Sequence, residues 1–307
     1  MIGRLYLFRR RAVREGSGVE VATLRAASPL GRTVRRFFRS PAGRAGTAGL
    51  VLVCLVVVLA PVITRHSPDS INLLAENEPP STAHWLGTDS LGRGVFTRTL
   101  YGGRASLEVG VLAVLIEMAI GTVLGGLAGF MRGAWDTIIM RLTDVVMTFP
   151  PIVIMLVVAA LLGPGLRNTI LVIGFLNWPV LCRLVRAKML SVRESGFIEA
   201  SRALGTARLK ILVRHALPNT VDVLIVFATL GMAQAILLEA GLSFLGLGVQ
   251  PPTPSWGNLI SPASNLQVLQ SFPWQWVPAG VAIVITVLSI NFIGDGLRDA
   301  LDPRSGQ

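Results

Sequence analysis

The chain has 307 residues, of which 52% are hydrophobic and only 15% are charged. Soluble domains carry about a quarter charged residues, so this composition favours an integral membrane protein. The net charge of +11 would suit a nucleic-acid-binding protein only if basic and aromatic residues gathered on a soluble face. The basic residues stand between long apolar blocks instead, so no nucleic-acid partner is expected.

Six apolar blocks approach the roughly 20 residues that a transmembrane helix needs. They cover residues 46–64, 106–130, 143–163, 168–186, 220–242 and 277–294. The sequence therefore predicts an all-α membrane protein with six transmembrane helices. Pro150 and Pro151 predict a kink near the start of the third helix, because proline lacks the amide hydrogen that a helix uses.

The distribution of lysine and arginine predicts the orientation in the membrane. Residues 1–44, 130–142, 183–219 and the C-terminal tail hold 11, 2, 8 and 2 of these residues, which makes 23, and the remaining 5 of the 28 lie in the other connecting segments. Segments rich in lysine and arginine stay in the cytoplasm. We therefore expect a multi-pass protein of the bacterial inner membrane with both termini in the cytoplasm.

The predicted spans divide the chain into four parts. Residues 1–30 are a basic cytoplasmic tail that we expect to be disordered and to contact anionic membrane lipid. Residues 31–105 hold the first span and a long external loop. Residues 106–300 form a core of five spans with a basic cytoplasmic loop at 187–219, and residues 301–307 are a second cytoplasmic tail.

Three polar residues inside the predicted spans are candidates for a translocation path: Glu117, Gln234 and Glu239. Glu117 lies one turn before a row of glycines spaced four residues apart over 121–129, a pattern that allows close helix packing. Polar side chains at this depth face protein or water rather than lipid. Hydrogen-bonded packing residues are the alternative interpretation of all three.

Two short helices are predicted in the basic cytoplasmic loop. The first covers about 194–204 and ends at Gly205, since glycine is common just after a helix. The second covers 206–216, is basic and stops before Pro218. Two interpretations are open: an amphipathic helix that lies on the membrane, or a docking element for a cytoplasmic partner.

The loop reads EASRALG at 199–205 and LP at 217–218, which resembles the EAA loop of ABC-importer permeases. Serine stands at the second alanine position, and His215 replaces the usual aliphatic residue. In that family the loop forms a coupling helix that seats in a groove of the ATPase subunit. The resemblance implies that the ATPase-coupling residues are Glu199, Ala200, Ser201, Ala203, Leu204, Gly205, Leu217 and Pro218.

Other stretches resemble the C-type permeases of dipeptide, oligopeptide and nickel importers. They read LGTDSLGR at 86–93, LYGGRASL at 100–107, FLGLGVQPPTPSWG at 244–257 and GDGLRDALDP at 294–303. Gly94 stands where the family usually has aspartate. Glycine, aspartate and proline also suit turns and extended segments, so a structural role and contact with a binding protein are both open.

No phosphate-binding loop of the G-x-x-x-x-G-K-[ST] type is visible, and no nucleophile, base and oxyanion donors stand together. Nor do histidine, cysteine and acidic residues show metal-ligand spacing. We therefore expect neither an enzyme nor a metal or cofactor in this chain.

The resemblance implies a permease that forms half of the translocation pathway for di- or oligopeptides. ATP and Mg would be bound by two separate ATPase subunits, and the other partners would be a second homologous permease and an extracytoplasmic substrate-binding protein. Nickel chelates and glutathione are alternative substrates. The competing class is an ion-coupled secondary transporter or channel, in which Glu117 and Glu239 would be coupling sites.

Overall fold

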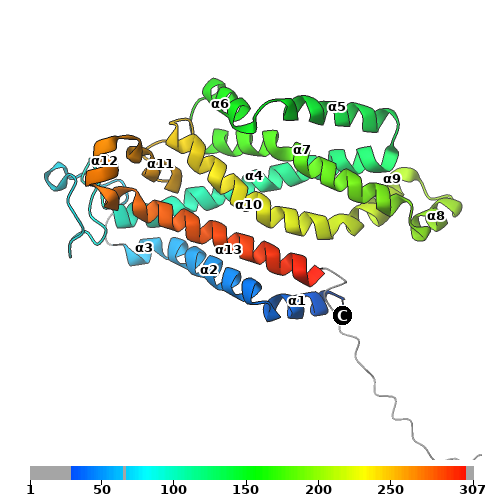
Figure 1. Cartoon of the computed structure of the whole chain (residues 1–307), viewed down its shortest axis with the longest axis horizontal. Coiled ribbons are helices and arrows are strands. Elements are labelled where there is room, and N and C mark those ends of the chain that lie inside the picture. Colours follow the sequence, from blue (N-terminus) through cyan, green and yellow to red (C-terminus); the bar gives the residue numbers. More distant parts are fainter. Residues whose placement is uncertain (1–28, 65–66, 302–307) are drawn as a thin grey trace, which may run out of the picture.

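The computed structural model describes residues 29–64 and 67–301, which form helices and loops without a β-strand (Figure 1). Among these residues, five helices are long and apolar enough to cross a membrane. They are α2 (Pro41–Val58), α4 (Val95–Met131), α7 (Leu166–Arg193), the helix that ends in α10 (Val221–Phe244), and α13 (Val277–Leu301). With the bent pair described next as a sixth span, the predicted all-α membrane fold is confirmed.

The third predicted span is broken rather than kinked. α5 (Ala134–Thr148) and α6 (Pro151–Leu162) meet at an angle of 86°. Two consecutive prolines force the break, because a residue before proline is pushed out of the helical region. Phe149 accordingly has an extended backbone at φ −91° and ψ 143°.

Several helix ends differ from the prediction. The first span was expected at 46–64, but Ser40 caps a helix that begins at Pro41, and a break at Leu59 separates it from the short α3 (Ala60–Ile63). α4 begins at Val95 instead of 106, and α13 runs to Leu301 instead of 294. Charged residues and glycines in these extra turns lower the hydropathy, but packing against neighbouring segments keeps the turns helical.

α4 and α7 are packed side by side along the predicted row of glycines. Gly121 faces Leu181, Gly125 faces the Cys182 backbone, and Gly129 faces the Arg186 backbone. Small residues let two backbones approach closely where larger side chains would hold them apart. The sequence prediction that this row meets another helix is confirmed, and the partner is α7.

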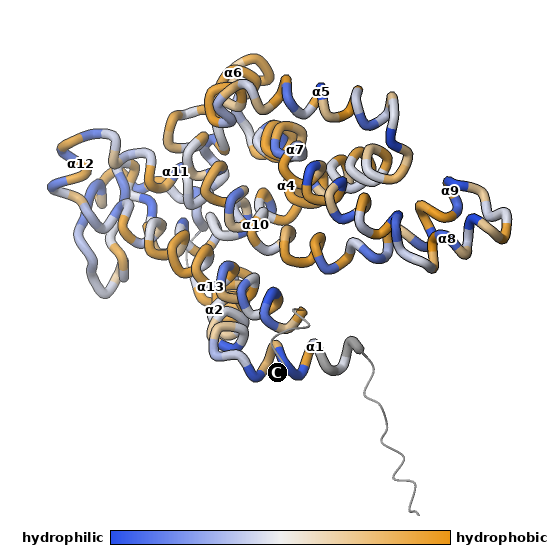
Figure 2. The backbone as a smooth tube through the Cα atoms, turned by 45° about the vertical axis from the view of Figure 1, so that its right-hand side comes forward, coloured by the Kyte–Doolittle hydropathy of each residue, from blue (hydrophilic) through white to orange (hydrophobic). Residues whose placement is uncertain are grey.

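A second helix pair, α2 with α13, flanks this centre, and α1 (Pro29–Arg39) packs on it (Figure 1). Gly46 of α2 lies against the backbone of Ser289 and Ile293 of α13. Hydrophobic residues follow the helices over most of their length (Figure 2). This distribution is the one expected of a bundle that sits in lipid.

Two groups of connecting segments lie at opposite ends of the bundle (Figure 1). At one end, residues 67–94 and 245–276 form a layer that we call the cap, with the short helices α11 (Trp256–Ile260) and α12 (Leu266–Ser271). At the other end lie α8 (Gly196–Ala203) and α9 (Arg208–Ile211), together with α1 and the end of α13. Residues 1–28 and 302–307, which hold most of the two predicted tails, are outside the described part of the chain.

Candidate functional site

The segment 194–220, which we call the α8 segment, leads from α7 to α10. α8 covers most of the predicted first helix, and Gly205 follows it with a φ of +76°. α9 then continues through a π-helical turn at Leu212–Ala216 and a 3-10 turn at Leu217–Thr220 into α10. The prediction that the second helix stops before Pro218 is wrong, because proline occupies the first turn of the 3-10 helix, where no amide donor is needed.

One face of α8 is buried against the protein, and the rest of its surface is exposed. Ile198 is fully buried in a cluster with Ile211 and Phe130, whereas Phe197 is 47% exposed and Leu204 is 85% exposed. Of the eight residues that the resemblance singled out, Ser201 and Leu217 are half-buried and the others are exposed: Glu199, Ala200, Ala203, Leu204, Gly205 and Pro218. An anchored helix with exposed apolar and small residues is suited to contact another protein.

Ion pairs tie α7 to its neighbours near the α8 segment. Arg186 donates two hydrogen bonds to Asp136 of α5, at 2.5 and 2.8 Å, and Arg183 pairs with Asp144 at 2.7 Å. Lys188 pairs with Asp222 of α10 at 2.6 Å. Bidentate arginine–carboxylate pairs fix orientation as well as distance, so the Arg186 pair holds α5 in a defined position on α7. The single Lys188 contact joins α10 to the same helix. No local sequence pattern predicts these pairs, whose members lie 34 to 50 positions apart.

The three candidate path residues have different surroundings. Glu117 is buried beside Gly231 of α10, and it makes no hydrogen bond or ion pair with the described residues. Gln234 lies on an exposed face of α10 with Leu230 and Leu237. Glu239 is fully buried and accepts hydrogen bonds from three serines. Only Gln234 is therefore accessible on the surface of the single chain.

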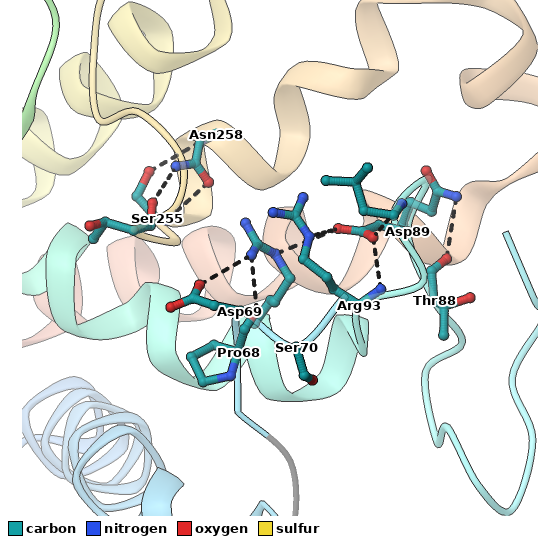
Figure 3. A network of polar contacts seen from close by, with 12 residues as sticks. Pro68, Asp69, Ser70, Thr88, Asp89, Arg93, Ser255 and Asn258 are labelled. Carbon is teal, nitrogen blue, oxygen red and sulfur yellow. Dashed lines mark hydrogen bonds and ion pairs between the residues drawn. The ribbon is translucent and has the colours of Figure 1, made fainter. Parts of the chain in front are cut away.

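The cap is organised around buried charges (Figure 3). Arg98, 2% exposed, donates to the Pro68 carbonyl oxygen at 3.0 Å and lies 3.7 Å from the carboxylate of Asp89. Arg93 donates to the same carboxylate at 2.7 Å. The Gly-Thr-Asp and Gly-Arg residues of this loop thus hold the fold of the cap together, which supports the structural interpretation of the motif.

Thr88 joins the two segments of the cap. Its carbonyl oxygen accepts hydrogen bonds from Trp274 Nε1 and Gln275 Nε2, both at 3.3 Å. Its hydroxyl donates to the Ala75 carbonyl oxygen at 2.5 Å. Residues far apart in the sequence thereby form one layer. Among the described residues, no group of three His, Cys, Asp or Glu side chains is arranged to hold a metal ion.

Comparison with protein families identifies the chain. The family described as binding-protein-dependent transport system inner membrane component matches residues 121–307, and the N-terminal transmembrane domain of oligopeptide transport permease C matches residues 28–80. The chain belongs to the binding-protein-dependent permeases. This membership confirms the predicted resemblance to importer permeases, which are transport components rather than enzymes.

Named relatives place this permease in the peptide branch of the family. A Brucella suis biovar 1 protein whose name designates a peptide permease is 49% identical over 278 residues, 90% of this chain and 92% of that protein. The dipeptide transport system permease protein DppC of Alkalihalophilus pseudofirmus is 44% identical, over 83% of this chain and 84% of its own. The glutathione transport system permease protein GsiD of Shigella boydii is 43% identical, over 98% and 99%.

The fold agrees with a solved permease structure. A chain of the MetNI methionine ABC transporter in an inward-facing conformation matches with a TM-score of 0.54 at 20% identity, over 68% of this chain and 97% of that one. The chain is thus an ABC-importer permease of the peptide type and a multi-pass protein of the inner membrane.

Proposed function

We propose that this permease forms half of the translocation pathway of an ATP-driven importer for di- or oligopeptides, and that α8 couples it to an ATPase subunit. The observation that carries the proposal is the shape of the α8 segment. One buried residue, Ile198, anchors α8, while its tip at Leu204 is 85% exposed. A push on that tip reaches the membrane helices through the short turn at 204–207, because the helical run that starts at Arg208 continues into α10 without a loop.

The proposed mechanism is alternating access with the helix bundle as the two-state element. Two ATPase subunits bind ATP and Mg and close, and each moves a coupling helix. This chain supplies one of these helices, and a second homologous permease supplies the other. The ion pairs of Arg186 and Lys188 would transmit the movement of α7 to α5 and α10.

We place the α8 end in the cytoplasm and the cap outside, where a binding protein delivers the substrate. Of the predicted cytoplasmic lysines and arginines, those at 183–214 gather at the α8 end, which supports this orientation. In a chain whose exposed Cys54 is replaced by serine, an impermeant maleimide applied to intact cells should label a cysteine at Ser81 but not one at Ala203. The opposite pattern would reverse the orientation.

The exposed face of α10 is the proposed contact with the second permease and the pathway. Leu230 is 37% and Leu237 is 46% exposed, and Gln234 lies one turn from each. We assign Gln234 to the pathway lining and place Glu117 behind it. Glu117 lies between α4 and α10, and its carboxyl group lacks a partner there. Movement of α10 away from α4 would expose it.

Peptides are the proposed substrate class. Relatives are named for peptide, dipeptide and glutathione transport, and glutathione is itself a tripeptide. Among the described residues, no cluster of acidic or histidine side chains favours a nickel complex instead.

Co-purification of the tagged chain from its native membrane tests the coupling role of α8. The unaltered chain should recover a second permease, two ATPase subunits and a binding protein. Leu204→Asp should lose the ATPases and keep the second permease. Leu74→Asp is the matched control, because Leu74 is 96% exposed in the cap, and it should keep both. Equal recovery of ATPases by the two variants would contradict the role of α8.

Recovery of the unaltered chain alone would contradict the importer itself. Transport by that lone chain, driven by an ion gradient, would then support the secondary-transporter class.

A further inference from the structure

Glu239, near the cap end of α10, is fully buried and joins three serine side chains. Its Oε2 accepts a hydrogen bond from Ser106 of α4 at 2.8 Å. Its Oε1 accepts hydrogen bonds from Ser243, one turn further along α10, at 2.7 Å and from Ser255 of the cap at 2.8 Å. Three separate elements therefore meet at one carboxyl group.

Each of these serines also accepts a hydrogen bond from a backbone amide of the cap. The pairs are Trp256 N–H with Ser106, Val249 N–H with Ser243 and Asn258 N–H with Ser255, at 3.1, 3.0 and 3.1 Å. A serine hydroxyl has a single proton. Because each hydroxyl oxygen accepts a hydrogen bond from an amide, its own proton is donated to Glu239. The hydrogen bonds therefore all run from the cap amides through the serines to the carboxyl group.

Gly257 leaves room for this network, and the buried side chain of Trp256 packs beside it. A Cβ at Gly257 would lie 2.8 Å from Oε1 of Glu239 and 2.8 Å from the Cα of Ala240. The indole of Trp256 is 1% exposed, and its Nε1 donates to the Thr99 carbonyl oxygen at 2.9 Å. The cap segment 249–258 is thereby fastened to α4 and α10 at several points.

The helix that carries Glu239 begins in the α8 segment. Arg208–Phe244 forms one helical run of 37 residues, with a π-helical turn and a 3-10 turn near its start. One end of this run follows the proposed ATPase contact, and the other end holds Glu239. A movement of this helical run would be passed through Glu239 to cap segment 249–258.

We propose that Glu239 is a positioning residue that links cap segment 249–258 to α10, so that the surface offered to the binding protein moves together with the α8 segment. The inference rests on the proposed function of the chain as an importer subunit. It replaces a role in the pathway for Glu239, which has no exposed surface toward a passing solute and already accepts three hydrogen bonds.

Amide hydrogen exchange in the purified complex tests the link at single-residue resolution. Glu239→Met should speed exchange at the amides of Val249, Trp256 and Asn258 together, because all three serine hydroxyls lose their acceptor. Glu239→Gln should affect mainly Trp256, since the amide oxygen can keep the two donors of Oε1 but the amide nitrogen cannot accept from Ser106. Loss of a hydrogen bond of ordinary strength corresponds to about tenfold faster exchange. Ser255→Ala should affect mainly Asn258, and Ser243→Ala mainly Val249. Unchanged protection of all three amides in Glu239→Met would overturn the proposal.

ATP hydrolysis by the complex tests the transmission and separates it from a purely structural role. Glu239→Gln should keep the basal rate and lose stimulation by the binding protein, whereas misfolding would lower both. Glu108→Gln is the matched control, since Glu108 is exposed on α4 two positions after Ser106, and it should keep both. Full stimulation in Glu239→Gln would contradict the transmission. If the unaltered complex shows no stimulation, the proposed function fails, and the exchange pattern still decides whether Glu239 positions the cap.

Discussion

Gly205 turns the chain sharply after α8, and its backbone conformation suits glycine and, less often, asparagine. At its φ of +76° a residue with a Cβ costs about 1–2 kcal/mol, and nothing within 4 Å would block the side chain itself. The backbone conformation, rather than space, therefore makes this position sensitive.

Gly205→Val is expected to lower transport strongly while membrane insertion stays unchanged, because the turn that orients the α8 tip is lost. Gly205→Asn is the matched control and should keep most transport, since asparagine tolerates this conformation. Uptake in cells and the amount of inserted protein check the prediction. Loss of inserted protein in Gly205→Val would mean that the segment is only structural.

Glu117 and Glu239 are two buried glutamates with opposite surroundings. Glu239 has three hydroxyl donors, and Glu117 has no partner among the described residues. Burial of a polar group without a hydrogen bond costs about 1–3 kcal/mol by mutational measurements. Substitution by methionine, which has a similar length, should therefore act on the two positions in opposite directions.

Glu117→Met is expected to raise the unfolding temperature of the detergent-purified chain and to lower transport, since a residue kept at a cost in stability is expected to serve function. Glu239→Met should lower the unfolding temperature, because three serine hydroxyls lose their acceptor. A stability loss in Glu117→Met would show that the carboxyl group forms stabilising contacts within the chain itself and is a packing residue.

At the scale of the element, the contact between α4 and α7 depends on backbone proximity. A Cβ at Gly125 would press on the Cys182 carbonyl and lie 2.9 Å from the Val185 Cβ. A Cβ at the neighbouring Gly126 would meet leucine side chains alone, Leu217 Cδ2 at 3.0 Å and Leu212 Cδ1 at 3.9 Å. A flexible side chain can move away, whereas a helix backbone held by ion pairs at Arg186 cannot.

Gly125→Ala is expected to destabilise the chain by about 1–3 kcal/mol, the usual cost of overpacking. Gly126→Ala should be close to neutral, because Leu217 can change rotamer. Thermal unfolding of the two variants in detergent provides the comparison. Equal unfolding temperatures would show that α4 and α7 are less tightly packed than the structure has them.

Long apolar blocks made the helices predictable, but their ends were not. α4 begins in a turn that contains Arg98, and hydropathy counts such a residue against a span. Its charge is compensated by Asp89 and the Pro68 carbonyl, partners that only the folded cap brings near. The two prolines predict the position of the break between α5 and α6. Its angle of 86° depends on how α5 and α6 each pack against α7 and is not predictable from the prolines.

The candidate site was predictable where it is local in sequence. EASRALG at 199–205 was recognisable because one helix and its glycine turn carry the motif. The network around Glu239 was not predictable, since Ser106 lies 133 positions before Glu239 and no spacing rule relates them. Its only trace in the sequence is that Ser106 and Ser255 stand within motifs shared with the family.

At the scale of the whole molecule, the two ends of the bundle have separate tasks in the proposed importer. The α8 end offers an anchored helix with an exposed tip, and the cap offers a layer held together by buried charges. α10 connects them as part of one helical run of 37 residues. In the proposed importer, the exposed face around Gln234 is the surface that a second permease would cover.

Uptake into proteoliposomes tests this account most directly. The complete complex would be reconstituted with ATP inside, and a labelled dipeptide and a labelled longer peptide would be offered outside together with the binding protein. Uptake of at least one peptide is expected only when ATP and the binding protein are both present, and Leu204→Asp should abolish it. Uptake by this chain alone, without ATP and driven by an ion gradient, would contradict the account.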